Sequence, residues 1–134
     1  MSRILVVEDE ALIALDLARQ LRGAGHEVVG PCRDGADALR RIAEAGPEAA
    51  VLDYTLRGTE TSEGIASDLA DRGIPFAFLT GHAASGLIAR GPFADRPRLT
   101  KPCSPDELLR AVRDLLSGPA PWRDGAGPRH ARWK

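Results

Sequence analysis

The sequence predicts a doubly wound α/β fold, in which a five-stranded parallel sheet carries helices on both faces. Short apolar runs recur along the 134 residues, and each is followed by a segment with helical spacing. Alternation of this kind gives parallel strands joined by right-handed crossovers. Several runs also end in an acidic, hydroxyl or basic residue, and in such sheets ligands bind where the strands end. The length is that of one domain with a substantial core.

Composition argues against several classes of function. The formal net charge of −1 is too small for a surface that attracts nucleic acid or a membrane by bulk charge. The first seven residues lack the pattern of a signal peptide, and no apolar run is long enough to span a membrane. Cys32 and Cys103 are far apart and have no metal-binding spacing, so we expect reduced thiols in a cytoplasmic protein.

The first predicted unit is a strand over 3–7 followed by a helix over 10–23. The strand is the apolar run RILVV, and it ends at the acids Glu8 and Asp9. The helix is indicated by aliphatic residues at every fourth position and is stopped near Gly23. Its expected core positions are Ile13, Leu17 and Leu21, with Ala14 and Ala18 beside them.

The second unit is a short strand over 27–30, closed by Pro31, and a helix. Asp34 can cap this helix, and the Gly46-Pro47 pair ends it. Its buried stripe is predicted to consist of Ala38, Leu39, Ile42 and Ala43.

The third unit contains the most apolar strand. Ala49–Asp53 reads AAVLD, which is typical of a strand buried on both faces, with Asp53 at its carboxyl end. A loop over 54–61 follows, and then a helix over 62–72 for which Ser62 is the expected cap.

The fourth unit is a strand over 75–79, ending at Thr80-Gly81, and a short, weakly indicated helix over 83–90. We expect His82 to be a loop residue.

The last unit begins with a poor strand over 98–100, which ends at Lys101-Pro102. Ser104 to Glu107 then reads SPDE, which has the serine, proline and glutamate of a capping box. One face of the helix that follows is apolar through Leu108, Leu109, Val112, Leu115 and Leu116. Cys103 is expected only to pack against the core.

Strand order 2-1-3-4-5, one of the two common ways to wind such a sheet, places the ends of the first and third strands side by side. Glu8 and Asp9 would then meet Asp53, while Thr80 and Lys101 arrive from the neighbouring strands. The sequence therefore predicts one cluster of polar side chains at the carboxyl edge.

Three carboxylates at one edge need positive charge. Two of them about 4 Å apart repel by roughly 4 kcal/mol at an effective dielectric of about 20. Lys101 supplies a single positive charge, so a hard divalent ion such as Mg²⁺ is the natural complement. Asp53 is then a candidate nucleophile that forms an acyl phosphate, and Thr80 and Lys101 are candidate partners of the phosphoryl oxygens.

Over residues 1–118 these motifs resemble the receiver domain of two-component response regulators, which has a flavodoxin-like fold. Glu8-Asp9 matches the acidic pair of that family, and Asp53 matches its phospho-acceptor. Thr80 matches the switch hydroxyl, and Lys101-Pro102 the Lys-Pro pair.

The resemblance implies a single-domain response regulator that takes a phosphoryl group from a histidine kinase or phosphotransfer protein, with Mg²⁺, and switches its binding to a downstream protein or to a second copy. Asp9, Asp53 and the backbone carbonyl of Thr55 would ligate the metal, with Glu8 acting through water. The N–H of Gly81 would help hold the phosphoryl group. Any catalysis would be limited to its own phosphorylation and dephosphorylation.

The chain also departs from most of that family. Arg57 stands where proline is usual, the loop before the third helix is longer, and Arg98 replaces the usual aromatic switch residue. The stretch 75–82, PFAFLTGH, is similar instead to the single-domain "FAT GUY" subfamily. That likeness implies a kinase of the HWE or a related class.

Two other functions remain open from the sequence. Taken singly, Glu8 and Asp9 are an ordinary acidic helix start, and Lys101 an ordinary solvated lysine. The first rival is a degenerate receiver that binds proteins without being phosphorylated. The second is a metal-dependent phosphohydrolase, although Thr55 stands where such enzymes carry a second aspartate.

Residues 119–134 form a tail rich in proline, glycine and arginine, with Trp122 and Trp133. This composition favours a disordered segment. The alternative is a basic, aromatic segment that docks on the acidic domain or on a partner. It is too short for a DNA-binding domain, and we expect no nucleic-acid partner.

Overall fold

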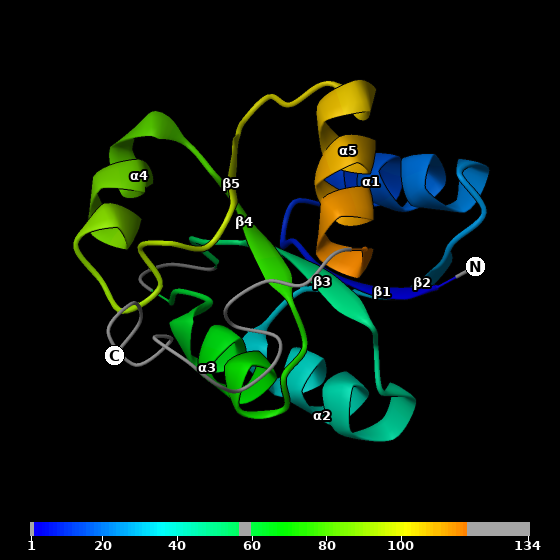
Figure 1. The fold of residues 1–134 in the computed structure, drawn as a ribbon, viewed down its shortest axis with the longest axis horizontal. Helices are drawn as coiled ribbons and strands as arrows, with labels where there is room; N and C mark the ends of the chain where they lie inside the picture. The colour runs from blue at the N-terminus through cyan, green and yellow to red at the C-terminus, as the bar shows by residue number, and fades with distance from the viewer. Residues whose placement is uncertain (1, 57–59, 118–134) are drawn as a thin grey trace.

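The computed structural model describes residues 2–56 and 60–117, and within them five parallel strands form one sheet in the order β2-β1-β3-β4-β5 (Figure 1). This confirms the predicted strand order and the flavodoxin-like architecture. The strands are β1 (Arg3–Val7), β2 (Glu27–Cys32), β3 (Ala49–Asp53), β4 (Phe76–Thr80) and β5 (Arg98–Thr100).

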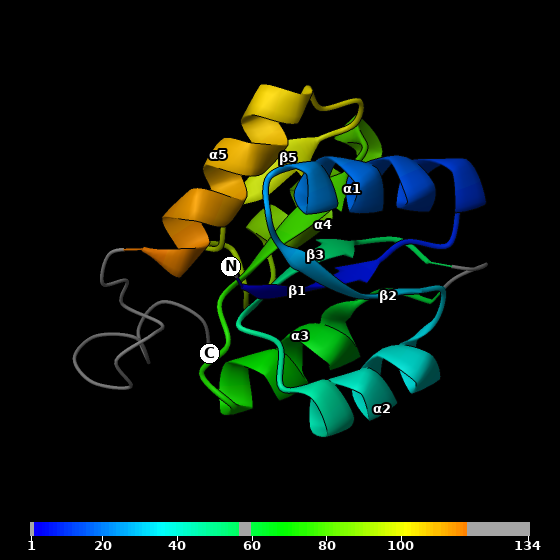
Figure 2. The ribbon, with the colours of Figure 1, turned by 90° about the vertical axis from the view of Figure 1, so that its right-hand side faces the viewer.

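Helices cover both faces of the sheet. Figure 2 shows α1 (Ala11–Gly23) and α5 (Pro105–Leu116) on one face, and α2 (Gly35–Ala45) and α3 (Glu63–Asp71) on the other. The short helix α4 (His82–Ala89) adds Ile88 to the core on the α2 and α3 side. None of the helices in the described ranges is both long and apolar enough to cross a membrane.

The sheet separates two hydrophobic cores, because successive side chains of a strand point to opposite faces. In β1, Leu5 and Val7 belong to the core under α2 and α3, whereas Ile4 and Val6 belong to the core under α1 and α5. Every residue of β3 is buried, which explains why AAVLD is an unbroken apolar run that ends in a single acid.

The prediction that β2 ends at Gly30 is wrong, because the strand continues through Pro31 to Cys32. The pairing with β1 shifts register between Leu5 and Val7, and Gly30 has φ +98°. A side chain on Gly30 would bring its Cβ to 2.6 Å from the backbone nitrogen of Cys32. The proline is tolerated because β2 is an edge strand with a local irregularity.

Several local expectations also need correction. Ser62 makes no capping hydrogen bond; Thr61 Oγ1 instead accepts one from the backbone N–H of Glu63, at 3.4 Å. In α2, Leu39 is 41% exposed and Ala43 is also exposed, so the buried stripe is narrower than predicted. His82 is the first residue of α4 and not a loop residue.

The start of α5 follows its sequence signals. Ser104 Oγ accepts a hydrogen bond from the backbone N–H of Glu107, and the Glu107 carboxylate accepts one from the N–H of Ser104. The predicted capping box is therefore confirmed. Leu108, Val112 and Leu115 are buried, while Leu109 and Leu116 are partly buried against the same core.

Candidate functional site

The candidate site lies at the carboxyl edge of the sheet, where four strands deliver polar side chains. Glu8 directly follows β1, Asp53 ends β3, Thr80 ends β4 and Lys101 follows β5. Parallel register places these ends together, since Asp53 pairs with Leu79 and Thr80 with Thr100. The fold thus brings together residues that are up to 93 positions apart in the sequence.

Three acids meet at this edge. Glu8, Asp9 and Asp53 each offer a carboxylate oxygen, and these oxygens all lie within 4.8 Å of one another. Glu8 and Asp53 are buried, whereas Asp9 is half-buried. The backbone N–H of Glu10 donates a hydrogen bond of 3.1 Å to Glu8 Oε2, which orients that carboxylate from the start of α1.

Lys101 bridges two of the acids. Its Nζ lies 3.1 Å from Glu8 Oε1 and 3.2 Å from Asp53 Oδ2, and it donates a hydrogen bond to the latter. The backbone N–H of Lys101 also donates to the carbonyl of Thr80 at 2.8 Å, which fixes the start of the β5–α5 loop against β4. One ammonium group therefore pairs with two buried carboxylates, and Asp9 has no ion pair among the described residues.

The electrostatics of the site reflect this shortage of positive charge. The pKa of Asp53 is raised to about 7, first by burial and then by the hydrogen bond and charge of Glu8, while Lys101 acts to lower it. Burial also acts to lower the pKa of Lys101, but the charges of Asp53 and Glu8 outweigh it and leave that pKa raised. A further cation at the site would favour ionised Asp53.

The donor set fits a hard divalent ion. Carboxylate oxygens are the ligands that Mg²⁺ prefers, and its remaining positions are commonly filled by water or by phosphate oxygens. The three acids lie at the ends of two adjacent strands, β1 and β3, and the carboxylate of Asp9 belongs to a residue that is partly open to solvent. The residues present therefore fit Mg²⁺, because Glu8, Asp9 and Asp53 offer oxygen atoms for the ion or for a water bound to it.

Thr80 and Gly81 lie on the β4 side of the cluster. Thr80 is 1% exposed, and its hydroxyl donates a hydrogen bond of 3.0 Å to the carbonyl of Gly81. Gly81 is exposed and is the N-terminal cap of α4, so its backbone N–H belongs to a helix start. The threonine hydroxyl is thus engaged locally, one residue away, rather than with Asp53.

Thr55 lies two residues beyond Asp53 in an ordered turn. It forms an isolated antiparallel bridge with Thr61, and Leu56 donates from its backbone N–H to the carbonyl of Glu60 at 2.8 Å. The residue is exposed, and its backbone carbonyl is the ligand that the family resemblance implies. Arg57 and Gly58, in the loop that departs from the usual family pattern, lie outside the described residues.

The sequence reasoning missed one contact next to the site. Tyr54, the residue after Asp53, is buried, and its hydroxyl donates a hydrogen bond of 2.7 Å to Glu63 at the start of α3. Its ring meets Phe78 edge-on, with 5.5 Å between centroids. Burial, with a contribution from Glu63, raises the pKa of Tyr54 to about 12. The available signal was a lone tyrosine placed directly after the strand that ends in Asp53.

Comparison with known proteins identifies the class. The model of the response regulator receiver domain matches residues 4–113, and the chain belongs to that family. Receiver domains bind Mg²⁺ at an acidic pocket and interact with kinases or phosphotransfer proteins, so this family explains why the edge is built from acids and one lysine.

Similar proteins include both short and longer response regulators. The transcriptional regulatory protein PdtaR of Mycobacterium tuberculosis is 34% identical over 117 residues, which are 86% of this chain and 57% of PdtaR. The structure of SdrG from Sphingomonas melonis Fr1 is 42% identical, with a TM-score of 0.76, and covers 87% of this chain and 98% of SdrG. PhyR from Brucella abortus is 30% identical, with a TM-score of 0.75, over 86% of this chain and 47% of PhyR.

This chain therefore spans about half the length of the curated relatives it matches. It resembles, over nearly its whole length, a single receiver of the SdrG kind.

Proposed function

We propose that the chain is a phosphorylation switch in two-component signalling, with Asp53 as the phosphoryl acceptor. One observation carries the proposal: a buried Asp53 carboxylate lies among two other acids and 3.2 Å from the ammonium of Lys101. A structural domain gains nothing from concentrating three carboxylates at one edge with a single lysine, whereas an in-line transfer of a phosphoryl group needs a carboxylate, a cation and a hydrogen-bond donor in this arrangement.

The proposed donor is a phosphohistidine of a histidine kinase or of a phosphotransfer protein. An oxygen of the Asp53 carboxylate attacks phosphorus, and a phosphorus–oxygen bond forms while the phosphorus–nitrogen bond breaks. The histidine ring keeps the electron pair of that bond and takes up a proton. Mg²⁺, when bound by Asp9, Asp53 and the Thr55 carbonyl, with Glu8 acting through water, supplies neutralising charge for the phosphoryl oxygens.

Three further groups respond to the new charge. A phosphoryl group brings roughly −1.5 to −2 at neutral pH. Lys101 pairs with one of its oxygens, the N–H of Gly81 donates to another, and the hydroxyl of Thr80 leaves the Gly81 carbonyl to donate to a third. Because Gly81 begins α4, this exchange is transmitted to that helix and changes the surface offered to partners.

The proposed output is protein–protein binding. The proposed donor is a histidine kinase of the HWE or a related class, or a phosphotransfer protein. The proposed target is a downstream protein or a second copy of the chain, and we expect neither nucleic acid nor a membrane to take part. One solved structure of SdrG, 43% identical over 86% of this chain, is described as its BeF3-activated conformation. That description supports the use of beryllofluoride as a probe of this site.

Intact mass spectrometry after treatment with acetyl phosphate tests the proposal. The chain should gain one phosphoryl group in the presence of Mg²⁺ and none after chelation. Asp53→Asn should abolish the gain, while Asp71→Asn, at an exposed aspartate of α3, should leave it unchanged.

An unmodified wild-type chain that still binds a partner would instead establish the degenerate receiver. Thr80→Ala provides a second test: it should retain phosphorylation but weaken the change in partner binding. Equal changes in the variant and the wild type would remove Thr80 from the switch.

A further inference from the structure

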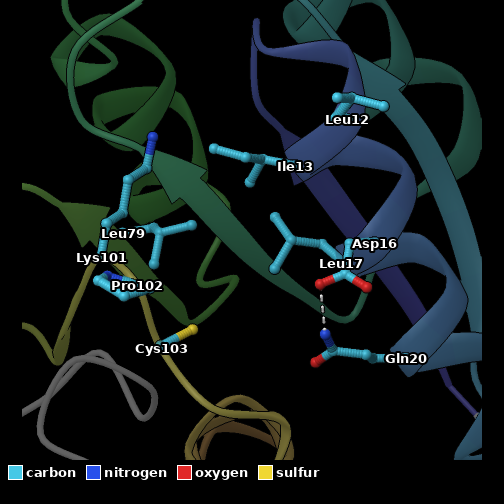
Figure 3. Close-up of a pocket in the computed structure, with 9 residues that line it drawn as sticks. All are labelled: Leu12, Ile13, Asp16, Leu17, Gln20, Leu79, Lys101, Pro102 and Cys103. Carbon is cyan, nitrogen blue, oxygen red and sulfur yellow. Dashed lines mark hydrogen bonds between the residues drawn. The ribbon is translucent and has the colours of Figure 1, made fainter.

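A groove of about 460 Å³ lies beside the acidic cluster, between α1 and the loop that joins β5 to α5. Figure 3 shows Ile13 and Leu17 projecting from α1 towards that loop, and the sulfur of Cys103 pointing back towards α1. The volume is within the range of pockets that hold a ligand or a large side chain. The groove is lined by Leu12, Ile13, Asp16, Leu17, Gln20, Leu79, Lys101, Pro102 and Cys103.

The groove is apolar and open. Leu12, at its rim, is 82% exposed, and Ile13 and Cys103 are only half-buried. One turn of α1 further on, Leu15 is also 57% exposed, although it does not line the groove. Large exposed aliphatic residues beside a hollow are typical of a surface that binds another apolar group.

The rim of the groove is acidic at the end away from the candidate site. Asp16 accepts a hydrogen bond from Gln20 at 2.7 Å and otherwise faces outward from α1. Burial raises the pKa of Cys103, and the charges of Glu107 and Asp16 add to this, so both acids are near the thiol. Lys101, the one cation among the described residues of the lining, is already paired with Glu8 and Asp53.

The chain itself contains a segment that suits this surface. Residues 119–134 hold both tryptophans of the protein, Trp122 and Trp133. Their charged side chains sum to +3, so residues 1–118 carry −4. An indole buries about 150–250 Å² and is the aromatic group best suited to an apolar hollow with a polar rim.

The geometry points to docking of the 119–134 segment in the groove between α1 and the β5–α5 loop, with a tryptophan side chain inserted against Leu12 and Cys103. The segment is long enough. The last helix, α5, has 12 residues, or about 18 Å, and runs from the groove to Leu116. Six extended residues from there to Trp122 span about 20 Å, and seventeen to Trp133 span over about 50 Å.

Docking would cover the α1 side of the candidate site without requiring phosphorylation. The segment and the domain are joined, so a contact too weak to form between separate molecules is favoured by an effective concentration in the mM range. The inference is independent of the proposed role of Asp53, because neither the groove lining nor the tail includes that residue.

Tryptophan fluorescence tests the inference directly, because both tryptophans lie in the segment. The emission maximum of the full chain should lie at a shorter wavelength than that of a fully exposed indole. Leu12→Gln, at the groove, should move the emission maximum to longer wavelength. Leu15→Gln, on the same helix but outside the groove, should leave the maximum unchanged. Fully exposed emission in the wild type, or equal shifts in the two variants, would overturn docking at this place.

The rate of alkylation of Cys103 is a second, independent readout. If the segment is docked about nine-tenths of the time, the thiol should react about tenfold more slowly than in Trp122→Ala/Trp133→Ala, which keeps every charge of the tail. The two single variants show which indole is inserted. Cys32, which is fully buried, should stay slow in all of them and reports on unfolding.

Protein concentration separates docking within one molecule from docking between two. Blue-shifted emission and slow alkylation should both be unchanged on dilution. Equal Cys103 rates in the wild type and the double variant would refute the inference, and protection that disappears on dilution would assign the groove to a second copy instead.

Discussion

The two faces of the sheet are packed with different kinds of side chain. The core under α2 and α3 contains all three phenylalanines and the one tyrosine of the chain, in edge-on or tilted contacts. The core under α1 and α5 is aliphatic. Strand β4 makes the division, because Phe76 and Phe78 face one side while Ala77 and Leu79 face the other.

The difference shows which face is closed and which is available. Interlocking rings fill the core on the α2 and α3 face, where Arg96 adds a cation–π contact 4.3 Å from the Phe76 ring, and the hollow beside α2 is lined mostly by charged side chains. The aliphatic face, in contrast, leaves the groove beside α1. We therefore expect mutations on the first face to change stability, and mutations at the groove to change binding.

The largest expected effect is at the centre of the aromatic core. Phe78→Ala removes a fully buried ring that contacts Tyr54 and Phe76, each at 5.5 Å, and should cost about 3–5 kcal/mol of unfolding free energy. Leu12→Ala, at the groove rim, should lower it by at most about 1.4 kcal/mol, which is the free energy of a contact formed nine-tenths of the time. Urea denaturation measures both, and Phe78→Leu is the milder variant if the alanine variant does not fold. Similar losses for Leu12 and Phe78 would contradict the comparison.

One cysteine lies on each face of the sheet, so the pH dependence of unfolding free energy gives a second comparison of the two faces. Burial, together with Asp37, raises the pKa of Cys32 to about 12 from the value of 9.0 expected in the unfolded chain. The folded state therefore holds a proton that the unfolded state has lost between pH 9 and 12. Stability should be retained below pH 9 and should fall above it, by at most about 1.4 kcal/mol per pH unit from this group.

Cys32→Ala should flatten the alkaline part of the stability curve, whereas Cys103→Ala, at the half-buried groove position, should flatten it less. The measurement is the free energy of unfolding in urea at several pH values between 8 and 11, taken as a slope so that the cavity left by the substitution does not enter. An unaltered slope in Cys32→Ala would show that the thiol is not the group responsible.

The smallest expected effect on stability concerns the N-terminal caps of two helices, α5 on one face of the sheet and α3 on the other. Ser104→Ala removes one half of the capping box of α5 and should cost about 1 kcal/mol. Ser62→Ala should cost nothing measurable, because the Ser62 hydroxyl caps no helix and is buried without a hydrogen-bond partner among the described residues. Thermal unfolding of the two variants checks this, and equal losses would mean that Ser62 acts as a cap in solution.

The sequence was sufficient where the signal was local or periodic. The alternation of strands and helices, the buried AAVLD strand and the SPDE capping box all depend on neighbouring residues, and each was confirmed. It failed where a distant element decided the outcome. Strand β2 continues past Pro31 because pairing with β1 and a register shift compensate for the backbone N–H that proline lacks. Neither feature can be predicted from the neighbouring residues.

For the candidate site, the sequence by itself determined which side chains stand at strand ends: two acids after β1, one acid at the end of β3, a threonine at the end of β4 and a lysine after β5. Only the tertiary structure decided that Lys101 reaches Glu8 and Asp53 together, that Thr80 turns to the Gly81 carbonyl, and that Tyr54 is tied to Glu63. The physical reason is range. Hydrophobic period and capping act over a few residues, whereas burial, ion pairing and the groove beside α1 arise only when segments far apart in the chain are brought together by the sheet.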